Sequence, residues 1–231
     1  MTNRIHTKLG DNGIVLKWLL NFWPPRFDMI YCDFMYEDTN FTYWLNDCVD
    51  LLTPTGSIFV QTDYRSIAEV KVHLDGLLGK ENYLNWIALP FDWGGRSDRF
   101  FGRKTDHLLW YSKSKDYKFF PDRVQIPKVT AGTGFDKNNK PTKLPTDYWG
   151  GYARLSTVSN EKIKGFSYQK PLKLMELLVQ ATTDTEDYVL DPFMGVGSMG
   201  VACKKLGRGY VGIEIDKGTF DIAKKRIDEC E

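Results

Sequence analysis

The sequence predicts an α/β fold in which helices cover both faces of a mostly parallel sheet. Three observations support this prediction. Short apolar runs typical of strands alternate with stretches of helical spacing along most of the 231 residues. Residues 188–215 run through a strand, a glycine-rich turn, a helix and a second strand, which is the pattern of a βαβ unit. Hydrophobic residues make up 42% of the chain, which suffices for a sizeable core and excludes a disordered or fibrous protein.

The first half of the chain supplies strands and helices in alternation. In chain order we expect strand, helix, strand, helix and strand over Arg26–Asp33, Tyr43–Leu52, Ser57–Asp63, Arg65–Leu78 and Asp106–Ser112. Pro54-Thr55-Gly56 is a turn signal that separates the first of these helices from the strand after it.

The second half of the chain contains the βαβ unit and one helix before it. That helix, Pro171–Ala181, begins with a proline, which is favoured in a first helical turn. The unit itself comprises a strand over Tyr188–Asp191, a helix over Gly200–Leu206 and a strand over Tyr210–Ile215. Gly132–Lys143, which combines Gly, Asn, Lys and Pro, predicts a loop.

The charge is balanced overall but uneven along the chain. The formal net charge is +1, yet Phe91–Lys143 holds twelve Lys and Arg against six Asp, a net of +6 that leaves −5 for the remainder. Aromatic residues are interleaved with these basic ones, and such a mixture can neutralise phosphates and stack on bases. The stretch therefore favours contact with nucleic acid. The alternative is a solvated loop over the core strand at Asp106–Ser112.

Scattered cysteines and histidines argue against a disulfide framework or a metal site. No two of the four cysteines are close enough in sequence for either, so we expect free thiols and no metal; they are Cys32, Cys48, Cys203 and Cys230. No apolar run reaches the roughly 20 residues that span a bilayer. The first residues lack the apolar segment of a signal peptide. We expect a cytoplasmic protein without a membrane partner.

A glycine loop indicates a cofactor site. Gly195 and Gly197 follow Asp191 at the end of a strand, and they allow a sharp turn and a close approach of the backbone to a ligand. Glu214 ends the next strand, about 20 residues further on, where an acid can accept hydrogen bonds from ribose hydroxyls. The pattern predicts an adenosine-containing cofactor. With Gly200, the loop also fits the string of dinucleotide binders, so a nicotinamide-dependent dehydrogenase is an alternative.

The residues around this loop resemble those of one enzyme family. Asp191-Pro-Phe-Met-Gly-Val-Gly-Ser198 resembles motif I of the S-adenosylmethionine-dependent amino-methyltransferases, with serine in place of the usual threonine. Tyr168-Gln-Lys-Pro171 is similar to the Gln-Lys-Pro element before motif I in the beta class of DNA amino-methyltransferases. Asp147-Tyr-Trp149 and Arg154 resemble residues between the recognition region and the cofactor half, and Lys8-Leu-Gly-Asp11 resembles the end of the third strand. The resemblance extends over most of the chain.

The resemblance implies a fold, a domain plan and a cofactor. The fold is a circularly permuted Rossmann-like methyltransferase fold with a mostly parallel, seven-stranded sheet. Residues 1–231 would form a single methyltransferase domain, with 91–150 as an inserted basic target-recognition region and 165–231 as the cofactor-binding half. S-adenosylmethionine would be bound by Asp11, Gln169, Lys170, Asp191, Phe193, Gly195, Gly197, Ser198 and Glu214.

The catalytic tetrapeptide of that family, Asp-Pro-Pro-Tyr, is altered here to Asp33-Phe34-Met35-Tyr36. The resemblance implies that Asp33 and the carbonyl of Phe34 accept protons of the target amine, while Tyr36 stacks on a flipped base. Loss of both prolines removes two fixed φ angles. Either tertiary packing holds the loop in their place, which we favour, or the site is slow or inactive.

We therefore expect a site-specific DNA methyltransferase that modifies the N6 of adenine in double-stranded DNA. An Asp at the first position favours adenine, since cytosine-N4 members of the family mostly have Ser there. The alternatives are a cytosine-N4 enzyme and a catalytically impaired DNA-binding subunit. A prokaryotic or phage origin fits this family. A homodimer and an associated restriction nuclease both stay open.

Overall fold

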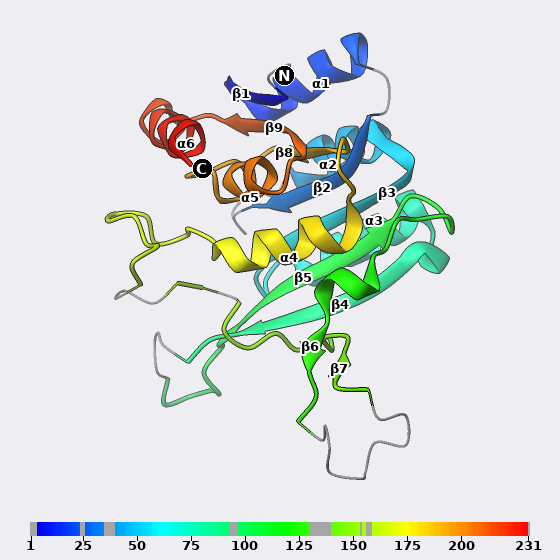
Figure 1. Ribbon diagram of the computed structural model, residues 1–231, viewed down its shortest axis with the longest axis vertical. Coiled ribbons are helices and arrows are strands. Elements are labelled where there is room, and N and C mark those ends of the chain that lie inside the picture. The colour runs from blue at the N-terminus through cyan, green and yellow to red at the C-terminus, as the bar shows by residue number, and fades with distance from the viewer. Residues whose placement is uncertain are drawn as a thin grey trace.

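The computed structural model describes residues 4–23, 26–34, 40–92, 97–129, 140–152, 154–155 and 159–230. Within them the chain forms a seven-stranded sheet between two layers of helices (Figure 1). The strands of the sheet are β1 (Ile5–Leu9), β2 (Phe27–Asp33), β3 (Leu52–Thr62), β4 (Tyr83–Pro90), β5 (Thr105–Ser112), β8 (Tyr188–Asp191) and β9 (Gly209–Glu214). The helices are α1 (Asn12–Phe22), α2 (Phe41–Leu51), α3 (Ile67–Leu78), α4 (Leu172–Thr182), α5 (Ser198–Lys205) and α6 (Lys217–Glu229).

Short elements complete the described chain. Two 3₁₀ turns, η1 (Lys80–Asn82) and η2 (Pro121–Val124), lie next to α3 and α4, respectively. A small antiparallel ribbon pairs β6 (Ile126–Pro127) with β7 (Thr142–Lys143), away from the main sheet (Figure 1). No helix within the described ranges is long and apolar enough to cross a membrane.

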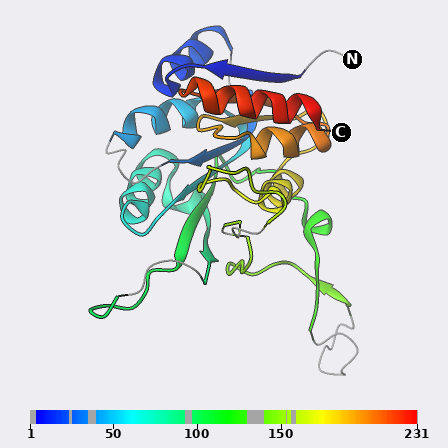
Figure 2. The ribbon, with the colours of Figure 1, turned by 90° about the vertical axis from the view of Figure 1, so that its left-hand side faces the viewer.

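The strand order is β1-β9-β8-β2-β3-β5-β4, and the first five of these strands are parallel to one another. β5 runs antiparallel to β3 and to β4. β1 pairs with β9 from Ile5 opposite Tyr210 to Leu9 opposite Glu214, so the two ends of the chain meet in one sheet. This arrangement, seen from the side in Figure 2, confirms the expected mostly parallel, permuted α/β fold.

Two cores lie on opposite faces of the sheet. Helices α1, α2 and α3 cover one face, and α4, α5 and α6 cover the other. β2 serves both cores because successive side chains of a strand point to opposite faces. Ile30 and Cys32 belong to the first core, while Met29 and Tyr31 belong to the second. A strand covered on both faces is continuously apolar, which explains why this run was recognisable in the sequence.

The predicted elements of the alternating pattern are present, and their boundaries differ from the predicted ones by at most about two residues except at the start of β3. β3 begins at Leu52 rather than Ser57, so the turn predicted at 54–56 is part of a strand. The register of β2 and β3 shifts between Phe27 and Met29, which marks a bulge. A Cβ on Gly56 would lie 2.9 Å from the Phe27 carbonyl oxygen, so the glycine permits this close backbone approach.

Several elements had no prediction of their own. Helix α1 begins after Asp11, whose carboxylate accepts a hydrogen bond from Ile14 N–H, and α6 begins after Asp216, which caps it in the same way. β4 pairs with β5 at the edge of the sheet. Residues 105–112, inside the basic stretch, form β5 between β3 and β4.

Candidate active site

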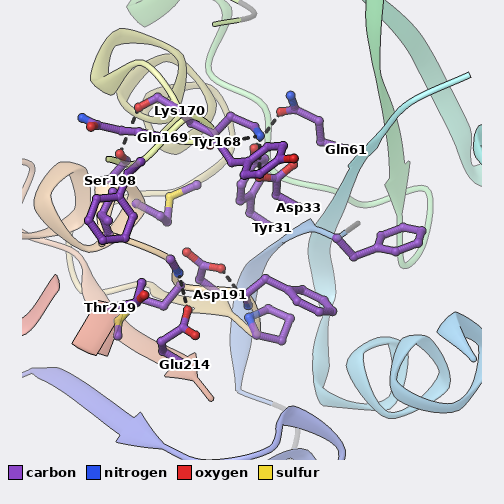
Figure 3. Close-up of a pocket in the computed structure, with 18 of the residues that line it drawn as sticks. Tyr31, Asp33, Gln61, Tyr168, Gln169, Lys170, Asp191, Ser198, Glu214 and Thr219 are labelled. Carbon is purple, nitrogen blue, oxygen red and sulfur yellow. Dashed lines mark hydrogen bonds and ion pairs between the residues drawn. The ribbon is translucent and has the colours of Figure 1, made fainter. Parts of the chain in front are cut away.

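A cavity of about 680 Å³ opens at the carboxyl ends of the parallel strands (Figure 3). Open α/β sheets bind ligands at this edge. Ten of the predicted site residues line it: Asp11, Asp33, Phe34, Gln169, Lys170, Asp191, Phe193, Gly195, Ser198 and Glu214. Gly197 lies in the same loop but outside the cavity wall, and Tyr36 lies outside the described residues.

The two loop glycines serve different purposes. Both have positive φ angles, +53° at Gly195 and +79° at Gly197, which favour glycine. A Cβ on Gly195 would meet only the Phe193 carbonyl oxygen, at 3.9 Å, so this position leaves room for a ligand. A Cβ on Gly197 would lie 3.1 Å from Ile227 and 3.2 Å from Ala223, both on α6. The first glycine therefore opens the cavity, and the second lets α6 pack closely.

Glu214, at the end of β9, holds the glycine loop. One carboxylate oxygen accepts a hydrogen bond from Gly195 N–H and the other from Asp216 N–H, each at 2.9 Å. The carbonyl oxygen of Glu214 accepts a hydrogen bond from Gly10 N–H at 2.8 Å. This bond brings Asp11, the cap of α1, to the same end of the cavity. Two acidic residues from opposite ends of the chain thus meet beside the loop.

Asp191, the last residue of β8, is only 2% exposed. Its carboxyl group accepts hydrogen bonds from Phe193 N–H at 3.1 Å and from the Tyr210 hydroxyl at 3.3 Å. Burial raises the pKa of Asp191 to about 8; the Phe193 hydrogen bond opposes this shift, and the charges of Asp33 and Glu214 add to it. In the free protein this carboxyl group is therefore largely protonated near neutral pH.

Asp33, the last residue of β2, forms an ion pair with Lys170 at 2.5 Å. Burial raises the pKa of Asp33, and the Lys170 ammonium opposes that shift. Figure 3 shows the two side chains meeting across the cavity from Asp191 and Glu214. The pair joins the β2 half of the site to the segment before α4.

Gln169 and Ser198 position that segment. The Gln169 amide oxygen accepts a hydrogen bond from Ile163 N–H at 2.7 Å, and its amide nitrogen donates to the Glu161 carbonyl at 2.8 Å. The Ser198 hydroxyl donates to the Lys170 carbonyl at 2.9 Å and accepts from Arg226 at 3.1 Å. Both side chains therefore hold the backbone around Lys170 in place.

Phe34 follows Asp33 and packs into the aromatic core beside α2. Its ring is 5% exposed, with its centroid 5.1 Å from that of Trp44 and 5.9 Å from that of Phe41. Phe193, from the cofactor motif, stacks edge-on against Trp44 at 4.7 Å. Apolar packing thus fixes the chain directly after Asp33, where the resemblance had led us to expect a proline. Met35 and Tyr36 lie outside the described residues.

Two groups in the cavity wall had no predicted role. Arg154, noted only through the resemblance, donates two hydrogen bonds to Asp106, at 2.8 and 3.0 Å. The hydrogen bond to Asp106 raises the pKa of Arg154. Tyr31 and Gln61, which lie two residues and one residue before the ends of β2 and β3, share a hydrogen bond of 2.7 Å. Their position at strand ends was the only signal in the sequence.

The charges of the cavity favour a cationic ligand. Six carboxyl groups line it against three basic side chains. Ion pairs or hydrogen bonds join Asp33 to Lys170, Asp63 to Arg65 and Asp106 to Arg154. The other three carboxyl groups, which have no ion pair within the described part of the chain, surround the glycine loop: Asp11, Asp191 and Glu214.

Comparison with known proteins gives consistent matches. The sequence model of the N6_N4_Mtase family, described as DNA methylase, matches residues 33–225. The type II methyltransferase M.HpaI of Haemophilus parainfluenzae is 31% identical over 202 residues, covering 86% of this chain and 60% of its own length. The chain thus spans less than two thirds of that relative.

Solved structures match nearly the whole chain. The crystal structure of the M1.HpyAVI–SAM complex is 26% identical, with a TM-score of 0.72, and the match covers 97% of this chain and 99% of that one. The cytosine-N4-specific PvuII DNA methyltransferase has a TM-score of 0.73 over 97% of this chain and 88% of its own. At 14% identity, the PvuII likeness concerns the fold alone.

Proposed function

Because this chain belongs to the N6_N4_Mtase family of DNA methylases, we propose that it transfers a methyl group from S-adenosylmethionine to the N6 of adenine in double-stranded DNA. One observation carries the proposal. Asp33 and the glycine loop that follows Asp191 face one cavity, at the ends of neighbouring parallel strands. A proton acceptor for the target amine and a cofactor loop are thus within one site.

The residues around the loop fit this cofactor, which supplies a methyl group on a positively charged sulfonium. Asp11 and Glu214 offer carboxylates that no basic side chain of the described chain pairs with, and Asp191 can ionise beside a cationic ligand. Glu214 keeps lone pairs for ribose hydroxyls beyond the two N–H groups it already accepts. Gly195 leaves open space for a close approach. Gln169 and Ser198 contribute by holding the Lys170 segment rather than through free polar groups.

On the acceptor side, Asp33 supplies the chemistry. An exocyclic base amine is a weak nucleophile because its lone pair is delocalised into the ring. Hydrogen bonds from the amine to the Asp33 carboxylate and to the Phe34 carbonyl would localise that lone pair on nitrogen. S-adenosylmethionine bound at the glycine loop would supply the methyl group, and Asp33 or water would accept the proton that the methylated amine loses. Lys170 favours the ionised form of Asp33 that this role needs.

The packing of Phe34 supports an active site rather than an impaired one. The prolines of the usual tetrapeptide restrict the backbone through φ. Here the buried ring of Phe34 restricts that residue through contacts with Phe41 and Trp44. Aromatic pairs of this kind contribute about 0.5–1.5 kcal/mol each beyond their burial. Packing of the Phe34 ring thus supplies a restraint next to Asp33 where the usual tetrapeptide has a proline.

We assign target contacts to the basic stretch outside β5. Within residues 97–104, Phe101 is 98% exposed and Phe100 is 53% exposed. Arg103 lies over the Phe100 ring at 4.5 Å and donates a hydrogen bond to the Tyr64 hydroxyl. Tyr64 sits between Asp63 and Arg65, both in the cavity wall. Exposed aromatic and basic side chains at the edge of the cavity suit a flipped base and its flanking phosphates.

The test is methylation of unmethylated duplex DNA, followed by digestion and nucleoside mass spectrometry. N6-methyladenine would support the proposal, and N4-methylcytosine would replace the acceptor base while keeping the enzyme class. Asp33→Ala should abolish methylation and leave cofactor affinity within about twofold, because Asp33 acts on the amine. Full activity in that variant would refute the assigned role. Cofactor binding without any methylated base would favour a DNA-binding subunit.

A further inference from the structure

Gln61 is a buried amide in the wall of the active-site cavity. It lies on β3 directly opposite Asp33 of β2 in the parallel register, and its side chain is 1% exposed. Its amide oxygen accepts a hydrogen bond from the Tyr31 hydroxyl at 2.7 Å. Its amide nitrogen has no hydrogen-bond partner among the described residues. Figure 3 shows Gln61, Tyr31, Asp33 and Lys170 gathered at one end of the cavity.

Buried donors are almost always paired in folded proteins, so an unpaired one needs an explanation. The unpaired amide belongs to a cavity-lining residue, and its neighbour in the sheet is the proposed proton acceptor. Burial raises the pKa of Tyr31 well above its usual value, so the phenol keeps its proton. Because the Tyr31 hydroxyl donates this proton to the Gln61 amide oxygen, the amide group is held in an orientation that leaves its nitrogen unpaired.

Asp33 and Gln61 therefore form an acceptor and a donor side by side, on strands that are about 4.8 Å apart. Adenine and cytosine carry the complementary pair on their Watson–Crick edges: an amine that donates, next to a ring nitrogen that accepts. Guanine and thymine carry the reverse, a carbonyl next to an N–H group. The pair thus matches the two amino bases and opposes the two keto bases.

We propose that Gln61 is a specificity-determining residue whose amide nitrogen donates to the ring nitrogen beside the target amine. This inference rests on the proposed function and concerns the same site. Gln61 would orient the base so that its amine meets Asp33, and it would place a donor against the N–H group of a keto base. Tyr31 is the positioning residue that keeps the amide in this orientation.

The experiment combines a side-chain change with a base change. On the duplex site that the wild-type protein methylates, single-turnover rates are measured for adenine and for 1-deazaadenine, which lacks the ring acceptor. If the mapped base is cytosine, 3-deazacytosine serves instead. Gln61→Met keeps the length of the side chain and removes the donor. Tyr31→Phe retains Gln61 but removes the hydroxyl group that holds the Gln61 amide in one orientation.

Gln61→Met should slow methylation of the natural base about tenfold, the effect of one lost hydrogen bond. Gln61→Met should not reduce the methylation rate of the deaza base any further, because that rate is already reduced in the wild-type protein. Tyr31→Phe should give an intermediate loss on the natural base only. Cofactor affinity serves as the control for a purely structural role and should change little in both variants, whereas Tm should fall in both because each breaks the buried Tyr31–Gln61 hydrogen bond.

Two results would overturn the inference. Equal slowing of both bases by Gln61→Met would show that the amide does not meet the ring nitrogen, and so would an unchanged rate on the natural base. A wild-type protein that methylates no base would instead refute the proposed function itself, and the inference with it. Activity of the wild-type protein thus separates the two failures.

Discussion

Raising the pH from 6 to 8 should tighten S-adenosylmethionine binding by up to about 50-fold, because Asp191 ionises over this range. The pKa of this carboxyl group is about 8 in the free protein, mainly because the group is buried. A cationic ligand beside it favours the ionised form and therefore lowers that pKa. Affinity rises with pH until Asp191 is ionised without the ligand, and it levels off above pH 8.

The magnitude follows from the ionised fraction. With a pKa of about 8, roughly 1% of Asp191 is ionised at pH 6 and roughly half at pH 8. If only the ionised form binds well, the apparent affinity follows that fraction. A 50-fold change corresponds to about 2.3 kcal/mol. Residual affinity of the protonated form would reduce this figure but not change its sign.

Isothermal titration at pH 6, 7 and 8 would measure this effect, and buffers of different ionisation heat would count the protons released on binding. Asp191→Asn is the matched control, since it keeps the shape and stays neutral. It also accounts for titration of the ligand's own amino group, which has a pKa in the same range as other α-amino groups. An affinity that is constant from pH 6 to 8 would refute the reasoning. So would an equal slope in the Asn variant.

Three further predictions concern stability. Because the pKa of Asp191 is raised, the free energy of unfolding of the ligand-free wild-type protein should fall by up to about 1.4 kcal/mol per pH unit between about pH 4 and 8, relative to Asp191→Asn. Thermal unfolding at several pH values would measure this difference. Parallel pH profiles of the two proteins would show that burial does not shift this pKa. Gly197→Ala should lower the free energy of unfolding by about 1–2 kcal/mol, because its φ is +79° and the added methyl group would contact α6 too closely. Gly195→Ala should mainly weaken cofactor binding, because its added methyl group would occupy space in the cavity. Phe34→Ala should cost about 3–5 kcal/mol in urea unfolding, while a loss below 1 kcal/mol would show that the ring is not an anchor.

Site residues could be predicted from the sequence where a chemically suitable side chain stands at the end of a recognisable strand. The glycine loop at 195–197 and the acids at the ends of their strands, Asp33 and Glu214, were predictable because each sits at a recognisable strand end. The contact between Asp33 and Lys170 was not, since it joins residues from separate elements that only the completed sheet brings together. Gln61 read simply as part of an apolar strand.

Element boundaries failed where the tertiary structure overrode a local signal. Pro54 and Gly56 are usual in turns, but here they lie in a strand whose bulge uses the missing Cβ of Gly56. β4 was not recognised because Tyr83–Pro90 mixes Asn and Pro with apolar residues at the edge of the sheet. Helix α6 has few apolar residues, and only Ala223 and Ile227 are buried.

The pairing of β1 with β9 has a consequence for how the protein is made. β1 leaves the ribosome about 200 residues before its partner, residues 209–214. Strand β1 therefore has no sheet to join until β9 has been made. Contacts so distant in sequence slow folding and leave a strand edge exposed in the meantime. In newly made chains, the cofactor end of the sheet should therefore become protected from proteolysis only after β9 has emerged.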